Sequence, residues 1–212
     1  MKIWPNMEQR TEEWFRARAG RLTASNFGRL LTPKTGKDSS QWEALAIELC
    51  CSCIRPDEVQ WEGNFHTDRG EALEPEACEE FSRLMGLEVV EVGFVTQDNN
   101  LIGCSPDRLI RVDGSFVSGL EVKAPLSKNH ARYLLKGDVP DEYKAQVHGA
   151  MAVTGFPCWY FMSYCPGLAP FIKKVCRDDY TAKLEDALER FVIYYADFRQ
   201  KTMPVLLGRG ES

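Results

Sequence analysis

The chain has 212 residues, of which 44% are hydrophobic and 27% are charged, and its formal net charge is −5 at pH 7. This length and composition are typical of one globular domain, and the acidic balance excludes a uniformly basic coat for nucleic acid. A local cationic lining would still bind phosphate inside an acidic exterior.

The sequence shows no targeting or membrane-spanning segment. No stretch approaches the roughly 18 apolar residues of a membrane span, and residues 1–6 lack the apolar core of a secretion signal. We therefore expect a cytoplasmic protein whose cysteines are reduced thiols packed as small core residues, with no structural zinc site. The eight cysteines are Cys50, Cys51, Cys53, Cys78, Cys104, Cys158, Cys165 and Cys176.

The first helix is predicted over residues 9–20, where Thr11 begins it and Gly20 ends it. Arg18 lies near its end, and either Thr23 or Ser25 is placed to cap a following helix. A hydroxyl at a helix start beside an arginine forms an anion pocket, because backbone N–H groups, the helix dipole and the guanidinium donors converge there. An ordinary cap beside a surface arginine is the alternative.

The middle of the chain alternates loops and regular elements. Residues 32–40 form the clearest loop, because they are rich in Pro, Gly and Ser. Helices are predicted over residues 41–54 and 68–85, and Pro75 suits the first turn of the second one. The β-forming residues of 87–96 predict one strand.

Two acidic residues then lie on neighbouring predicted strands. Asp107 follows an apolar run and a Ser-Pro pair, and Glu121 ends a second run after the turn at residues 113–114. Glu121 and Lys123 are two residues apart and face the same way, whereas the Val122 side chain enters the core and its carbonyl is free to face a metal. Paired carboxylates hold Mg²⁺, and a lysine beside a metal-bound water orients that water or accepts its proton.

The rest of the chain completes an α/β pattern. Helices are predicted over residues 127–136 and 140–153, strands over 157–164 and 169–176, and a last helix from the cap Asp178 to about residue 199.

The chain resembles a known nuclease family in four blocks that occur in the family's order. The Pro-Asp…Glu-x-Lys pattern resembles the PD-(D/E)XK nuclease superfamily, and the remaining blocks resemble the lambda exonuclease (YqaJ-type viral recombinase) family within it. The resemblance covers about residues 9–200 and implies one domain over 1–212, with a mixed central β-sheet flanked by helices. The blocks are residues 14–25, Gly70 to Glu74, Asp107 with Glu121 and Lys123, and Gln146.

The resemblance also implies roles for individual residues. Asp107 would bridge two Mg²⁺ ions, for which Mn²⁺ substitutes, and Glu121 and the Val122 carbonyl would complete one metal site. Lys123 would orient the attacking water. Glu74 would assist it, and Gln146 would lie near the metal or the scissile strand. The DNA 5′-phosphate would be bound by Arg18, Thr23, Ser25 and Lys34.

The implied activity is an alkaline exonuclease. It would digest the 5′-ended strand of double-stranded DNA in the 5′→3′ direction and release mononucleotides. A ring-shaped homotrimer and a single-strand annealing protein are the implied partners. A site-specific endonuclease with the same core, and a non-catalytic DNA-binding protein with a degenerate core, are the two alternatives.

Overall fold

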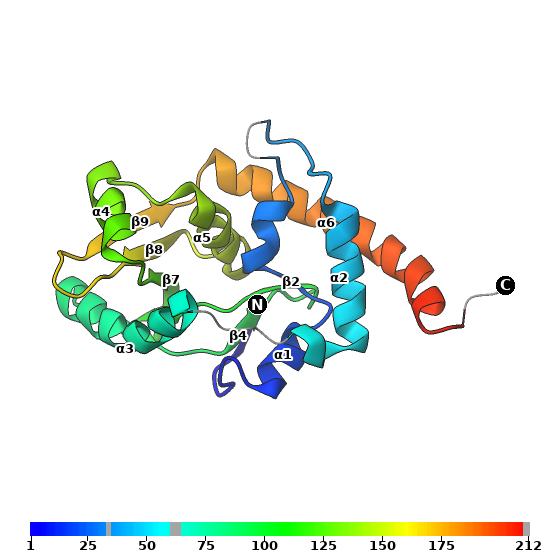
Figure 1. Ribbon diagram of the computed structural model, residues 1–212, viewed down its shortest axis with the longest axis horizontal. Helices are drawn as coiled ribbons and strands as arrows, with labels where there is room; N and C mark the ends of the chain where they lie inside the picture. The colour runs from blue at the N-terminus through cyan, green and yellow to red at the C-terminus, as the bar shows by residue number, and fades with distance from the viewer. Residues whose placement is uncertain (33–34, 60–64, 210–212) are drawn as a thin grey trace.

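The structure is a computed structural model that describes residues 1–32, 35–59 and 65–209 (Figure 1). The α-helices are α1 (Glu12–Arg18), α2 (Trp42–Ile54), α3 (Phe65–Met85), α4 (Ser127–Lys136), α5 (Asp141–Thr154) and α6 (Asp179–Leu206), and η1 (Ala24–Arg29) and η2 (Pro56–Val59) are 3₁₀ helices. The strands are β1 (Lys2–Trp4), β2 (Leu22–Thr23), β3 (Glu88–Val90), β4 (Phe94–Thr96), β5 (Ile102–Cys104), β6 (Arg108–Val112), β7 (Ser115–Lys123), β8 (Cys158–Ser163) and β9 (Phe171–Cys176).

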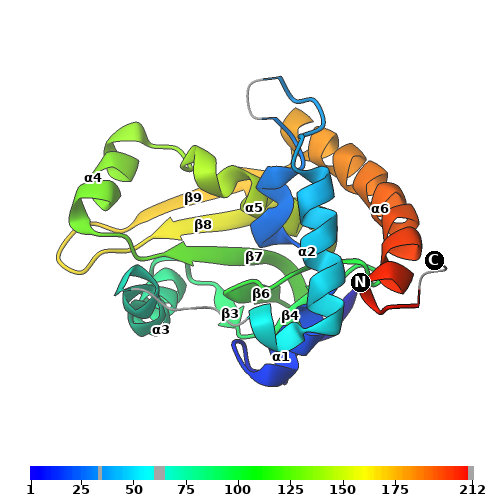
Figure 2. The ribbon, with the colours of Figure 1, turned by 45° about the vertical axis from the view of Figure 1, so that its right-hand side comes forward.

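The predicted α/β class, with mixed sheets flanked by helices, is confirmed, but the strands form two sheets instead of one. The first has the order β1-β4-β5-β2, and the second has the order β3-β6-β7-β8-β9. Each sheet is mixed, because β2 is parallel to β5 and β7 is parallel to β8, while the other neighbours are antiparallel. Figure 2 shows β7, β8 and β9 side by side.

The single strand predicted over residues 87–96 is wrong, because the chain changes sheets within it. β3 joins the five-stranded sheet and β4 joins the four-stranded one. Gly93 lies at the break, where its N–H donates to the Trp4 carbonyl at 3.1 Å. A Cβ at this position would lie 2.0 Å from the Met7 carbonyl oxygen, so a side chain would prevent the N-terminal segment from crossing here.

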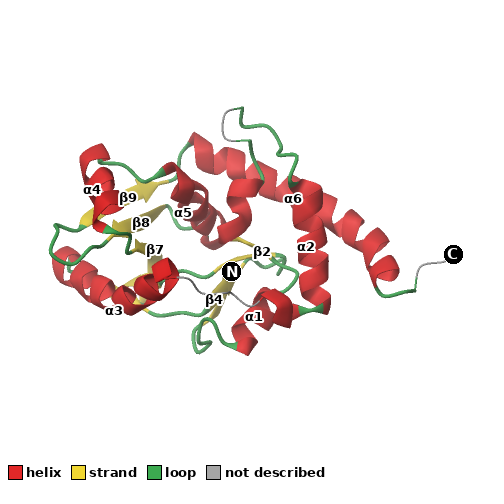
Figure 3. Cartoon of the chain, in the orientation of Figure 1, coloured by secondary structure: helices red, strands yellow, loops and turns green. Residues whose placement is uncertain are grey.

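The five-stranded sheet carries helices on both faces, as the cartoon in Figure 3 shows for α3, α4 and α5 around β7–β9. Alternate strand residues pack in two separate clusters, as the period of a strand requires. On the α3 face, Phe81 packs with the side chains of Leu120 and Val122. On the α5 face, Met151 belongs to a larger cluster that includes Phe161 and extends to α2 and α6.

Helix α3 contains Pro75 in its interior and not in its first turn. The helix begins at Phe65, so the proline lies in its interior, and the prediction of a first-turn proline is wrong. An interior proline removes one backbone hydrogen bond and disfavours a helix. Burial of Ala77, Cys78 and Phe81 against the sheet offsets that cost.

The prediction that every cysteine is a free thiol is also wrong, because Cys158 and Cys176 form a disulfide. The two residues are directly opposite each other in the antiparallel pair β8–β9, and their Cα atoms are 4.0 Å apart. Facing positions on adjacent antiparallel strands bring two Cβ atoms close enough for such a bond. The other six cysteines are free.

Among the helices that the structure describes, none is both long enough and apolar enough to cross a lipid bilayer.

Candidate active site

The two predicted catalytic acids meet at the end of the β6–β7 ladder. Arg108 pairs with Leu120 as the last register pair, so Asp107 lies just before β6 and Glu121 just after that pair on β7. Beyond this pair, the Asp107 carboxylate takes the place of a backbone acceptor: its Oδ2 accepts a hydrogen bond of 2.6 Å from the Val122 N–H. This bond fixes the Asp107 carboxylate beside β7.

Glu121 and Lys123 point to the same side of β7, and the Val122 side chain is buried on the other, as the spacing predicted. Glu121 Oε1 accepts hydrogen bonds from Lys123 Nζ and, at 2.5 Å, from Gln146 Nε2 on α5. The Glu121 side chain is only 3% exposed, whereas that of Lys123 is 27% exposed. The lysine therefore links a buried carboxylate to the surface of the site.

Glu74 reaches the same region from α3. Its Oε1 accepts a hydrogen bond of 2.8 Å from Arg108 Nη1, and the same nitrogen donates to the Asp107 carbonyl. The structure therefore brings together Glu74, Asp107, Glu121, Lys123 and Gln146, which come from one end of the five-stranded sheet and the helices on its two faces.

The carboxylates are close enough for their charges to affect the pKa values of Glu121 and Glu74. Burial raises the pKa of Glu121 to about 7, and the charges of Asp107 and Glu74 add to the rise, although Lys123 opposes it. Burial and then the Asp107 charge raise the pKa of Glu74. For Lys123, burial acts to lower the pKa, but the Glu121 and Asp107 charges outweigh it and raise the pKa above its usual value. Lys123 is therefore protonated at neutral pH and acts as a donor.

The donor set fits a hard divalent cation. Among the described residues, no protein donor contacts Asp107 Oδ1 or Glu121 Oε2. The C=O of a strand residue points to the same side as its N–H, so the Val122 carbonyl is directed toward Asp107. No three His, Cys, Asp or Glu side chains of the described chain form a metal-ligand group. Mg²⁺ commonly takes one or two carboxylates and completes its shell with water and substrate phosphate oxygens.

A second polar cluster surrounds Arg18 at the end of α1. The guanidinium donates to Ser105 Oγ at 2.9 Å, to Thr23 Oγ1 at 3.2 Å and to Ser25 Oγ at 3.4 Å. It also stacks on the Trp14 ring, with Cζ 4.2 Å from the centroid. Burial lowers the pKa of Arg18 to about 10, so it stays charged at neutral pH.

This cluster has the features of an anion pocket, but it is not built on a helix start. Among the described residues, no carboxylate forms a salt bridge with Arg18, and the hydrogen bonds of this half-buried guanidinium all go to hydroxyl groups. The predicted capped helix is instead the six-residue 3₁₀ helix η1, and the Thr23 side chain makes no cap hydrogen bond. The Thr23 hydroxyl accepts a hydrogen bond from Arg18 instead. The pocket is therefore defined by the guanidinium and the hydroxyl groups, and not by a helix dipole.

One short connector joins the two clusters. Residues 105–107 lead from β5, in the four-stranded sheet, to β6, in the five-stranded sheet. Ser105 contacts Arg18, and Asp107 contacts β7. Gln9 holds this connector, because its Nε2 donates to the carbonyl of Pro106 at 3.0 Å and to that of Val92 at 3.1 Å.

Three residues of the site were not predicted from the sequence: Gln9, Ser105 and Arg108. Ser105 could have been found from its place two residues before Asp107, on the same side of an extended chain. Gln9 and Arg108 carry no pattern that marks them. The predicted phosphate contact Lys34 lies outside the described residues.

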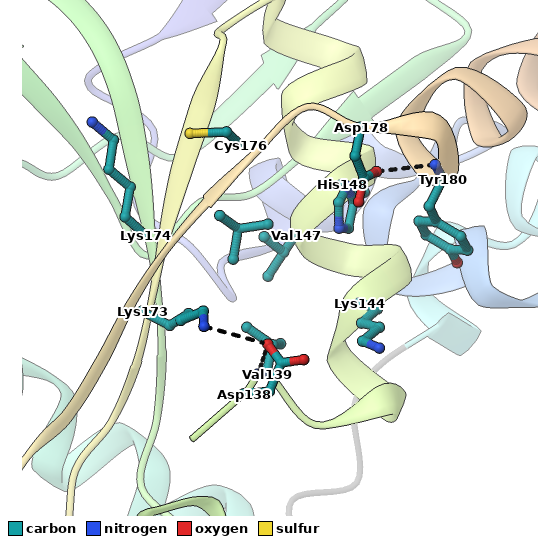
Figure 4. Close-up of a pocket in the computed structure, with 11 residues that line it drawn as sticks. Asp138, Val139, Lys144, Val147, His148, Lys173, Lys174, Cys176, Asp178 and Tyr180 are labelled. Atoms are coloured by element: carbon teal, nitrogen blue, oxygen red, sulfur yellow. Dashed lines mark hydrogen bonds and ion pairs between the residues drawn. The ribbon is translucent and has the colours of Figure 1, made fainter. Parts of the chain in front are cut away.

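His148 belongs to a different part of the molecule. It is buried, and its Nδ1 lies 2.8 Å from Thr181 Oγ1 and 3.6 Å from Asp178 Oδ1. It lines a pocket of about 360 Å³ together with Lys144 and Lys173, and Figure 4 shows these side chains. None of the candidate catalytic residues lines this pocket. These contacts are those of a side chain that packs in the fold.

Comparison with known proteins identifies the family. A profile of the YqaJ-like viral recombinase domain matches residues 13–157. An alkaline exonuclease (LHK-Exo) from Laribacter hongkongensis superposes with a TM-score of 0.78 at 28% identity, over 94% of this chain and 100% of that chain. The same exonuclease in complex with dAMP gives a TM-score of 0.70 at 28% identity, over 92% of this chain and 100% of that chain.

A phage-related exonuclease from Haemophilus somnus 129PT shares the fold, with a TM-score of 0.61 at 16% identity, over 86% of this chain and 96% of that chain. No curated protein sequence matches significantly. The profile covers more than half of the residues, and the resemblance seen in the four sequence blocks is therefore confirmed: the chain belongs to the YqaJ-like viral recombinase family.

Proposed function

We propose that this protein is a Mg²⁺-dependent exonuclease, a single domain over residues 1–212 that digests the 5′-ended strand of linear double-stranded DNA in the 5′→3′ direction. It releases mononucleotides and leaves a 3′ single-stranded overhang. Family membership and the similarity to an alkaline exonuclease support nuclease chemistry. The complex of that exonuclease with dAMP supports a mononucleotide product.

The observation that carries the proposal is the connector that joins a carboxylate centre to an anion pocket. Ser105 and Asp107 are two residues apart, so their Cα atoms are separated by at most about 7 Å. A terminal phosphate bound at Arg18 and a phosphodiester at Asp107 are then separated by a length on the scale of one nucleotide. This spacing favours removal of single nucleotides from an end over cleavage within a duplex.

Asp107, Glu121 and the Val122 carbonyl would hold the cation, and in the DNA complex phosphate oxygens would complete the shells of two ions, Mg²⁺ or Mn²⁺. When bound, the cation neutralises charge at the phosphoryl group and lowers the pKa of a coordinated water. Lys123 orients the attacking water with its ammonium donors, and Gln146 holds the Glu121 carboxylate in place. Phosphoryl transfer needs positioning and charge neutralisation, so no nucleophilic side chain is required.

Arg18, Thr23, Ser25 and Ser105 bind the 5′-phosphate. A terminal phosphate carries more negative charge than an internal diester, and a half-buried guanidinium that has no carboxylate partner among the described residues favours the more highly charged group. Lys34 would add a contact as a point charge from its loop. A ring-shaped homotrimer with a basic channel, a single-strand annealing partner and a cytoplasmic location complete the proposal.

The test uses one linear duplex with one 5′ end phosphorylated and the other carrying a hydroxyl group, beside the same DNA as a closed circle. We expect Mg²⁺-dependent release of mononucleotides that begins at the phosphorylated end, and an intact circle. Cleavage of the circle would support the endonuclease alternative. Binding of ends without cleavage under every metal condition would support the non-catalytic alternative.

A further inference from the structure

The side chain of Arg108 lies between the catalytic connector and Glu74. We propose that Arg108 is a positioning residue that neutralises Glu74 and limits the DNA-free protein to one tightly bound divalent cation, held by Asp107 and Glu121. This inference rests on the proposed function, because it concerns the same metal centre. It adds that the second cation binds together with DNA.

The ion pair is enclosed by the fold. The Arg108 side chain is 13% exposed and that of Glu74 is 22% exposed, and the bond between them is 2.8 Å long. Arg111, also on β6, forms a similar pair with Glu88, but those side chains are 40% and 54% exposed. Solvent therefore screens the Arg111 pair far more than the Arg108 pair.

Arg108 is held in this position by more than one contact. Its main chain pairs with Leu120 in the ladder, and its Nη1 also donates to the Asp107 carbonyl. A second carboxylate, that of Glu91, lies 3.8 Å from Nη2. The guanidinium therefore cannot leave Glu74 without losing its hydrogen bond to the Asp107 carbonyl on the connector.

The charges explain the limit to one ion. Lys123 pairs with Glu121, and Arg108 pairs with Glu74. Of the three carboxylates of the site, Asp107 is therefore the one that forms no salt bridge with a described side chain. A second cation at Glu74 would lie a few Å from the guanidinium. Even with the dielectric constant of water, that repulsion weakens binding on the order of tenfold. An incoming phosphate supplies the negative charge that offsets it.

The experiment counts Mn²⁺ ions by calorimetric titration of the full chain without DNA, for the wild type and three variants. We expect one tight site in the wild type and in Arg108→Lys, which keeps the charge. In Arg108→Gln we expect a second site that binds at least about tenfold tighter than in the wild type. Arg111→Gln, which removes the exposed pair of the same strand, should titrate like the wild type.

The double variant Glu74→Gln/Arg108→Gln keeps the inference testable if Arg108→Gln does not fold, because it buries no unpaired charge. One ion bound with wild-type affinity supports the inference, since Glu74 is then no ligand in the DNA-free protein. Loss of that ion, or an Arg108→Gln titration identical to that of the wild type, overturns it. A wild type that binds no Mn²⁺ at all would instead refute the metal centre of the proposed function.

Discussion

The buried carboxylate of Glu121 makes stability depend on pH when divalent cations are removed. Its pKa is raised from 4.5 to about 7, mainly by burial. As pH rises through this range, the unfolded chain releases the proton first and the folded chain retains it. The free energy of unfolding therefore falls between about pH 4.5 and pH 7, by about 3 kcal/mol in total.

The variant Glu121→Gln removes this ionisation but keeps an oxygen that accepts from Gln146. In EDTA, we expect the stability of the variant relative to the wild type to increase by about 2 kcal/mol between pH 5 and pH 8. Lys123 does not account for this change in the wild type, because its raised pKa keeps it protonated throughout that window. Mg²⁺ should restore the wild type at pH 8 and have little effect on the variant.

Urea denaturation at the two pH values measures the difference directly. The control is Glu88→Gln, because Arg111 lowers the pKa of the exposed Glu88. The stability from that pair is present above the ordinary pKa of 4.5 and is lost only as pH falls through the lower folded-state pKa, so Glu88→Gln should differ from the wild type by nearly the same amount at pH 5 and pH 8. If Glu121→Gln differs from the wild type by the same amount at pH 5 and pH 8, the burial argument for Glu121 is refuted.

Three further outcomes are expected. Asp107→Asn should lower cleavage of linear DNA by more than about 1,000-fold, while fluorescence anisotropy still shows binding to DNA ends. Arg18→Ala should lower the rate on 5′-phosphorylated ends by roughly 100-fold and the rate on hydroxyl ends far less, whereas Arg16→Ala, on the same helix, should keep the wild-type ratio. Cys158→Ser should lower the free energy of unfolding of the oxidised protein by about 3 kcal/mol, because the Cys158–Cys176 bond closes a loop with a sequence separation of 18 residues. Mass spectrometry after alkylation should find this bond in the wild type.

The helices were predictable because their signals are local. The predicted helix over residues 41–54 is α2 (Trp42–Ile54), and the predicted cap Asp178 forms a capping box with Thr181 at the start of α6. The strands β1 and β2 have three and two residues, too few to show an alternating pattern. The change of sheet at Gly93 depends on the close approach of the Met7 backbone. No local sequence pattern reveals this contact, because the two residues are far apart in the chain.

In the site too, the arrangement of residues close in sequence was predictable, whereas contacts between residues far apart in sequence were not. Glu121 and Lys123 are two residues apart, so the strand period alone sets their relative direction. The bond from Arg108 to Glu74 spans 34 residues, and that from Arg18 to Ser105 spans 87. Such contacts exist only after α1, α3 and the two sheets have packed, and one sequence contains no direct record of them.

The N-terminal segment therefore belongs to the active site although it carries no catalytic group. The carboxylate centre rests on one sheet and the anion pocket on the other, and the connector at residues 105–107 joins the two along the chain. β1 pairs with β4, and Gln9 bonds both the Val92 carbonyl before that strand and the Pro106 carbonyl in the connector. These contacts fix one sheet relative to the other. The distance from the Arg18 cluster to Asp107 is therefore set by the fold of the first ten residues as well as by the connector, and under the proposed function this distance determines the length of the product.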